Sequence, residues 1–209
     1  MRTCRTFEDL ESMEHGLVFS VGSGKTGKST LAFSLAEQIV NFAARPKYFY
    51  DVMPIDVDRL FPGFKIVRDL WNIPPGSIVF FEDMIRLFAS RGSGNKAEFP
   101  AWLSLISQND LVAIISTQDF MDIDVSAFRL QKPITIHSYM FEQDLKHERP
   151  EYVLNQAFAN IEIERHIRTH PEHDPRSIKH CSDYNETFTV EPPSYWSKAH
   201  SQLFRGLKV

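Results

Sequence analysis

One segment of the chain combines residue types and a spacing that suit the binding of a phosphate chain. Residues 22–29 read Gly-Ser-Gly-Lys-Thr-Gly-Lys-Ser. Glycines let backbone N–H groups turn inward around an anion, and a helix that begins there adds the positive end of its dipole. We expect Lys28 to reach the β- and γ-phosphates and the Ser29 hydroxyl to bind Mg²⁺. The predicted nucleotide contacts are Gly22, Ser23, Gly24, Lys25, Thr26, Gly27, Lys28, Ser29 and Thr30.

The residues on both sides place this segment in the context that a phosphate-binding P-loop requires. Residues 17–21 are apolar and predict a strand, and apolar residues at steps of three and four predict a helix over 30–42. A strand, a glycine-rich turn and a helix in this order predict a site for a nucleoside triphosphate. The alternative, a glycine turn that only caps a helix, does not account for the full motif.

Two carboxylates follow a second apolar strand. Residues 77–83 read Ser-Ile-Val-Phe-Phe-Glu-Asp, and a continuous apolar run suits a parallel strand that is buried on both faces. Ligands bind at the carboxyl ends of such strands. We assign Glu82 to Mg²⁺ and Asp83 to the attacking water, although the pattern leaves open which carboxylate has which role. An ordinary acidic turn after a strand is the alternative.

A polar amide ends a third predicted strand, at residues 111–118. This strand follows the acidic pair by one strand–helix–strand unit, with a helix expected over 99–107 between them. The side chain of Gln118 is therefore expected beside the carboxylates, where an amide can sense the γ-phosphate and orient the water.

The composition describes an ordinary globular chain of 209 residues with a formal net charge of −4. Any contact with nucleic acid must therefore come from a local basic surface. Residues 91–96, together with Arg86, are either such a DNA-facing loop or a solvated one. With only Cys4 and Cys181, we expect a reducing compartment and no disulfide framework. No apolar run is long enough to span a bilayer, so we expect a soluble, intracellular protein.

The remaining elements are predicted from periodicity and from breaking residues. The prolines at 54, 62, 74 and 75 predict short pieces and loops over residues 55–75, and a long helix is expected over 151–169 with its apolar residues mostly on one face. That face comprises Val153, Ala157, Phe158, Ile161 and Ile167. The other predictions are a helix or arm over 1–15, strands over 47–52 and 133–139, an edge strand over 185–190 and a helix over 194–203.

Four histidines and a cysteine lie close together in the sequence between His166 and Cys181. Their spacing is loose and no Cys-x-x-Cys pair accompanies them, which argues against a zinc site. Solvated histidines beside a proline-containing loop are the better interpretation of this tract.

The three motifs together resemble a known family, the additional-strand P-loop ATPases of the FtsK and HerA type. The resemblance is carried by the P-loop, by Ile-Val-Phe-Phe-Glu-Asp-Met-Ile-Arg-Leu-Phe at 78–88 and by Ala-Ile-Ile-Ser-Thr-Gln at 113–118. The acidic pair usually reads Asp-Glu in this family, so its order here is a departure. Small members include the genome-packaging ATPases of membrane-containing icosahedral viruses and the zonula occludens toxin-like assembly ATPases of filamentous phages.

The resemblance implies a mainly parallel α/β sheet of the P-loop NTPase type, flanked by helices, with a small C-terminal strand-plus-helix extension. An ATPase core over 16–140 would follow the helix or arm at 1–15, and residues 141–209 would complete the same domain. The resemblance also implies ATP and Mg²⁺ as ligands and a homo-oligomeric ring, a pentamer or hexamer, that pulls double-stranded DNA. An arginine would complete the site across the ring interface. Arg129 is our first candidate, with Arg91 and Arg149 as rivals.

Within the family we favour viral genome packaging, because the phage assembly ATPases usually carry a membrane-spanning helix. A capsid vertex or portal protein would be the partner, and the host cytoplasm or the virion the location. Two alternatives stay open within the family: a zonula occludens toxin-like phage assembly ATPase, and a plasmid or conjugative DNA-transfer ATPase. A small-molecule kinase would need an arginine-rich lid, whereas residues 119–150 hold only Arg129 and Arg149. A GTP-dependent switch would need motifs that are missing or misplaced here.

Overall fold

The structure is a computed structural model that describes residues 4–50, 57–82, 98–118, 129, 131–146 and 150–203. Its strands are β1 (Gly16–Val21), β2 (Lys47–Tyr50), β3 (Phe64–Val67), β4 (Ile78–Glu82), β5 (Val112–Thr117), β6 (Ile134–His137), β7 (Ile178–Cys181) and β8 (Glu186–Thr189). Its helices are α1 (Arg5–Glu11), α2 (Lys28–Ala36), α3 (Val57–Leu60), the 3-10 helix η1 (Leu70–Asn72), α4 (Glu98–Leu103), α6 (Glu142–Leu145), α7 (Pro150–Thr169) and α8 (Lys198–Leu203).

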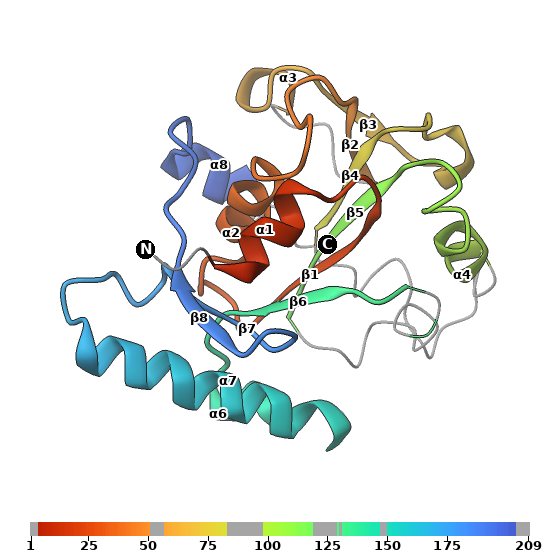
Figure 1. The fold of residues 1–209 in the computed structure, drawn as a ribbon. Helices are drawn as coiled ribbons and strands as arrows, with labels where there is room; N and C mark the ends of the chain where they lie inside the picture. Colours follow the sequence, from red (N-terminus) through yellow and green to blue (C-terminus); the bar gives the residue numbers. More distant parts are fainter. Residues whose placement is uncertain are drawn as a thin grey trace.

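The strands form one sheet in the order β3-β2-β4-β5-β1-β6-β7-β8 (Figure 1). Among the described residues, six strands are parallel to one another: β3, β2, β4, β5, β1 and β6. The antiparallel hairpin of β7 and β8 extends the sheet beyond β6. The predicted fold class, a mainly parallel α/β sheet, is confirmed. Strand β5 lies between β1 and β4, so the P-loop strand and the acidic strand are not direct neighbours.

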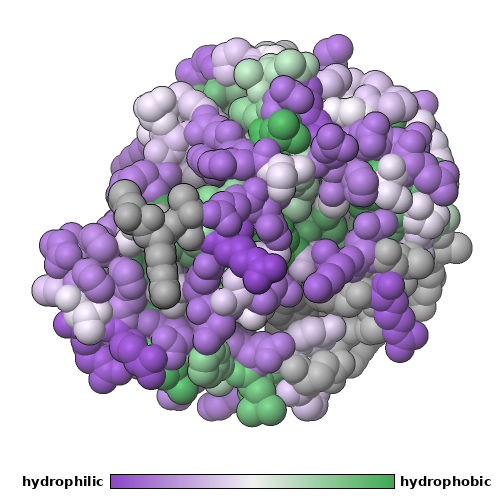
Figure 2. Space-filling view, in the orientation of Figure 1, coloured by the Kyte–Doolittle hydropathy of each residue, from purple (hydrophilic) through white to green (hydrophobic). Residues whose placement is uncertain are grey.

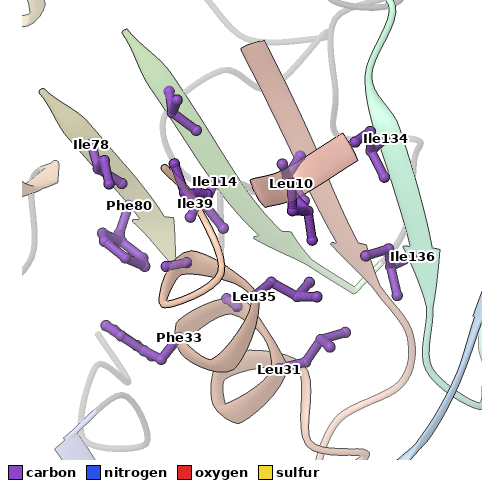
Figure 3. Packing of buried hydrophobic residues seen from close by; sticks show 14 of the residues in the cluster. Leu10, Leu31, Phe33, Leu35, Ile39, Ile78, Phe80, Ile114, Ile134 and Ile136 are labelled. Carbon is purple, nitrogen blue, oxygen red and sulfur yellow. The ribbon is translucent and has the colours of Figure 1, made fainter. Parts of the chain in front are cut away.

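Alternate residues of the central strands point to opposite faces of the sheet, which makes two apolar layers. On one face, α2 packs Leu31, Phe33 and Leu35 toward β4, β5 and β6 (Figure 3). On the other face, Phe99 and Trp102 of the α4 region pack with the opposite side chains of β1, β4 and β5. Burial on both faces explains why these strands read as continuous apolar runs.

The C-terminal part of the chain differs from the prediction at the edge of the sheet. The expected single edge strand is a hairpin of β7 and β8, and β7 pairs with β6. Within the apolar face of α7, Phe158 and Ile161 are about half exposed. The buried side of α7 carries Gln156 and Asn160, since both amides bond to the chain just after β6.

The other predicted elements are present with shifted bounds. The helix after the P-loop ends at Ala36 rather than residue 42, and the segment expected to hold short pieces contains an additional parallel strand, β3.

Hydrophilic residues cover most of the face shown in Figure 2. Within the described residues, the structure contains no helix with the length and apolar character needed to cross a membrane.

Candidate functional site

The P-loop connects the carboxyl end of β1 to the first turn of α2. Two of its glycines are required by the space around them. A Cβ on Gly22 would lie 2.7 Å from the Cβ of Ser138, and one on Gly27 would lie 3.0 Å from the carbonyl oxygen of Arg176. Gly27 also has a φ of 86°, a left-handed conformation that disfavours residues with a side chain. The loop backbone is therefore packed closely against segments that come much later in the chain.

Lys28 is buried, and its ammonium donates a hydrogen bond of 2.9 Å to the carbonyl oxygen of Ser23. The hydroxyl of Thr26 donates to the same oxygen at 2.7 Å. The side chains of Thr26 and Lys28 thus share one carbonyl oxygen of the loop. The bond from Lys28 keeps its ammonium inside the loop, where the motif predicts that the phosphates bind.

The structure brings together the two residues that the sequence assigned to the metal. The hydroxyl of Ser29 donates a hydrogen bond of 2.9 Å to Oε2 of Glu82, and Glu82 is buried at the end of β4. Hydroxyl and carboxylate oxygens are ligands that Mg²⁺ accepts, so this pair fits the ion. Asp83, predicted to act on the water, lies outside the described residues.

Gln118 follows β5 directly, between the P-loop strand and the acidic strand. In the sheet register, Thr117 lies opposite Val21 of β1, and Ser116 lies opposite Glu82 of β4. The backbone of Gln118 therefore lies at the same edge of the sheet as the P-loop and Glu82.

Of the three arginine candidates, the described residues include Arg129 alone. Arg129 is exposed at the surface. Arg91 and Arg149 lie outside the described residues, as do the basic loop at 91–96 and Arg86. Arg129 therefore stays a prediction for the interface between neighbouring copies.

The sequence does not indicate three residues that contact the P-loop from later segments of the chain: Phe141, Asp144 and Lys179. Ser23 donates to a carboxylate oxygen of Asp144, near the end of α6, and accepts a hydrogen bond from the backbone N–H of Phe141. Lys179 of β7 donates to the carbonyl oxygen of Thr26 at 2.9 Å and to the hydroxyl of Ser138. The sequence gives little indication that Lys179 is buried, because a lysine within a short strand is typical of an exposed edge strand.

The histidine tract is only partly solvated. His170 is exposed and its ring stacks on that of His166, but His180 and Cys181 are buried in β7. The interpretation of all four histidines as solvated is therefore wrong for His180, since the hairpin places it under α7. In the described part of the chain, no group of three or more His, Cys, Asp or Glu side chains could hold a metal ion.

His137, at the end of β6, makes the fold sensitive to acid. Its Nδ1 lies 2.7 Å from Oε1 of Gln156, and burial lowers the pKa of His137 to about 4. An unfolded imidazole binds a proton near pH 6.5, so between pH 6.5 and 4 the unfolded chain holds more protons than the folded one. We expect this group alone to reduce the free energy of unfolding by about 3 kcal/mol as the pH falls through that range.

Urea unfolding at several pH values between 7 and 4.5 measures this effect. Compared with the wild type, the variant His137→Gln should lose less stability on acidification. The control Leu154→Gln changes an exposed side chain that carries no titratable group, so it should follow the wild-type curve. Parallel curves for wild type and His137→Gln would contradict the assignment.

Comparison with known proteins places the fold. No protein-family profile and no curated protein sequence matches the chain. Among solved structures, the DNA-packaging ATPase B204 of Sulfolobus turreted icosahedral virus is similar, with a TM-score of 0.52 and 14% identity over 86% of this chain and 98% of the other. B204 of Sulfolobus turreted icosahedral virus 2, in complex with AMPPCP, has a TM-score of 0.53 and 14% identity, with coverage of 86% and 98%. The pCW3 conjugation coupling protein TcpA, bound to ATPγS, has a TM-score of 0.54 and 11% identity, covering 93% of this chain and 65% of that protein.

These identities are low, so the likeness concerns the arrangement of the chain in space. At that level it confirms the fold that the resemblance implies, a mainly parallel α/β sheet of the P-loop NTPase type. This chain shares its fold with viral DNA-packaging ATPases and with a conjugation coupling protein.

Proposed function

We propose that this chain is an ATP-hydrolysing motor that translocates double-stranded DNA, and that it does so in the packaging of a viral genome. The observation that carries the proposal is the contact between Ser29 and Glu82 next to a complete P-loop. Support also comes from the similar fold of a DNA-packaging ATPase over almost the whole length of that protein.

In this proposal the nucleotide lies across the P-loop, and water attacks its γ-phosphate in line with the leaving oxygen. Lys28 balances the charge that develops on the phosphates. Ser29 and Glu82 would hold Mg²⁺, and the ion would supply positive charge to offset that of the β- and γ-phosphates. Gln118 and Asp83 place the attacking water, and Asp83 accepts its proton.

A neighbouring copy of the chain completes the site in the same proposal. Arg129 is exposed, which leaves it available to a second copy in a ring. A guanidinium offered across an interface stabilises the charge of the transition state and couples hydrolysis in one subunit to the position of the next. A ring of five or six copies would enclose the DNA, and a capsid vertex or portal protein would anchor it.

The alternative function is DNA transfer between cells. It is favoured by one observation, the similar fold of a conjugation coupling protein that was solved with ATPγS. Both functions require ATP hydrolysis that is coupled to the movement of DNA. They differ in the partner protein to which the motor docks.

Steady-state ATP hydrolysis, measured at low salt with and without double-stranded DNA and at two protein concentrations, tests the proposal. We expect turnover per subunit to rise with DNA and with protein concentration. The reason is that a site receives the arginine of its neighbour only when the ring has assembled. DNA binding through phosphates should weaken as salt is added. Turnover that is indifferent to both DNA and concentration would contradict a ring-forming motor and direct attention to phosphoryl acceptors.

A further inference from the structure

Lys179 is a buried lysine that the proposed reaction does not yet use. It lies on β7 with 2% of its surface exposed. Its ammonium donates to the carbonyl oxygen of Thr26 at 2.9 Å, to the hydroxyl of Ser138 at 2.9 Å and to the carbonyl oxygen of Arg176 at 2.7 Å. A lysine ammonium has three N–H donors, and here each has an oxygen to accept it.

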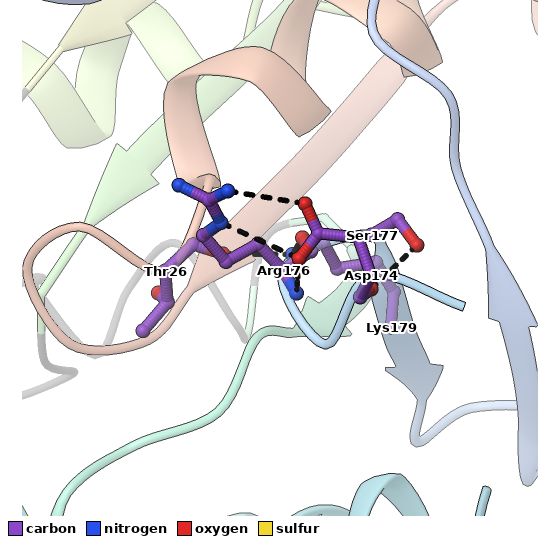
Figure 4. A network of polar contacts seen from close by, with 5 residues as sticks. All are labelled: Thr26, Asp174, Arg176, Ser177 and Lys179. Carbon is purple, nitrogen blue, oxygen red and sulfur yellow. Dashed lines mark hydrogen bonds and ion pairs between the residues drawn. The ribbon is translucent and has the colours of Figure 1, made fainter. Parts of the chain in front are cut away.

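The three acceptors come from three separate segments. Thr26 belongs to the P-loop and Arg176 lies in the turn before β7 (Figure 4). Ser138 follows β6. The neighbouring carboxylate of Asp174 forms an ion pair of 3.2 Å with the guanidinium of Arg176. None of the three bonds to the ammonium comes from a carboxylate. The ammonium therefore brings a positive charge to the P-loop through neutral acceptors.

The packing around Gly27 shows how closely this ammonium approaches the loop. A Cβ on Gly27 would lie 3.5 Å from Nζ of Lys179 and 3.0 Å from the carbonyl oxygen of Arg176. Gly27 directly precedes Lys28. The bond to the carbonyl of Thr26 and the tight contact at Gly27 therefore fix the backbone conformation just before Lys28. A shift of the β7 hairpin would be transmitted to the phosphate-binding N–H groups.

We propose that Lys179 is a positioning residue for the nucleotide, which fixes the P-loop through Thr26 and contributes a second positive charge behind the phosphate-binding loop. The inference rests on the proposed function, because it assumes that a nucleotide occupies the loop. The ligand chemistry is that of a polyphosphate, whose negative charge offsets the two ammonium groups of Lys28 and Lys179.

The protonation of Lys179 supports this role. Burial, followed by the charge of Lys28, lowers the pKa of Lys179 to about 7, against the opposing charge of Asp174. Lys28 approaches from the P-loop and α2, and Asp174 from the turn before β7. A bound polyphosphate adds negative charge near both lysines and raises the pKa of Lys179. Binding at pH 8 should therefore take up a fraction of a proton.

Calorimetric titration of the full chain with Mg·ATP tests the proposal without requiring turnover. We expect Lys179→Met to weaken binding by about tenfold or more, as the loss of a charge-assisted contact implies. The matched control is Lys65→Met, an exposed lysine of β3 at the opposite end of the sheet. In hydrolysis, Lys179→Met should raise KM more than it lowers kcat.

Titration at pH 8 in two buffers of different ionisation enthalpy gives the second readout. The wild type should take up protons on binding, and Lys179→Met should lose this uptake, which a merely structural change would leave in place. If Lys179→Met does not fold, the wild-type measurement still decides, because an absence of proton uptake would overturn the proposal. Equal affinity of wild type and Lys179→Met would also overturn it. Failure of the wild type to bind Mg·ATP would instead contradict the proposed function itself.

Discussion

Lys28→Ala is expected to reduce ATP hydrolysis by on the order of 10³-fold, because it removes the positive charge assigned to the β- and γ-phosphates. The ammonium is buried and already held within the P-loop by the carbonyl of Ser23, so little reorganisation is needed when phosphates arrive. Turnover per subunit, measured with saturating DNA and Mg·ATP, gives the size of the effect.

A second lysine variant separates loss of catalysis from loss of charge in general. Lys65→Ala removes an exposed lysine of β3 and should hydrolyse ATP at the wild-type rate. The thermal unfolding of Lys28→Ala should remain cooperative. Residual turnover of Lys28→Ala within threefold of wild type would mean that this loop does not position the reacting phosphates.

Phe33→Ala is expected to lower the free energy of unfolding by about 4 kcal/mol. Phe33 is fully buried on α2, the helix that carries Lys28 and Ser29 at its start. Among the described residues, five aromatic rings lie within 6.0 Å of its ring, centroid to centroid: those of Phe49, Phe61, Phe64, Phe80 and Trp196. Truncation leaves a cavity among rings that belong to different elements and cannot all move inward.

Urea unfolding followed by circular dichroism measures this loss. Phe158→Ala is the matched control, because the same substitution on α7 removes a ring that is about half exposed and should cost less than about 1 kcal/mol. Since Phe33 anchors the helix behind the P-loop, nucleotide affinity should fall in Phe33→Ala as well. A loss of stability no larger than in Phe158→Ala would contradict the assignment of this cluster as the core under α2.

The parts of the site that lie within one continuous motif could be predicted from the sequence. The P-loop needs local glycines and a strand–helix context, and Glu82 and Gln118 end buried strands whose apolar runs are easily recognised. Their meeting at one edge follows from parallel pairing, which brings the carboxyl ends of neighbouring strands together.

The support behind the P-loop could not be predicted in the same way. Lys179 is separated from Thr26 by 153 positions, and no local pattern indicates that a lysine in a short strand will be buried. The apolar periodicity of α7 does not indicate which side of the helix is buried. Gln156 and Asn160 face inward since the backbone after β6 offers them hydrogen-bond partners, a fact that depends on tertiary structure alone.

The place of β1 in the sheet has a consequence for the chain during its synthesis. This strand is made before its two hydrogen-bonding neighbours, β5 and β6, which begin only at residues 112 and 134. A nascent chain shorter than this exposes both edges of a strongly apolar strand, and such edges can pair with other chains. The emerging polypeptide must therefore be kept from self-association until its second half appears, and truncated forms that end before residue 112 should aggregate.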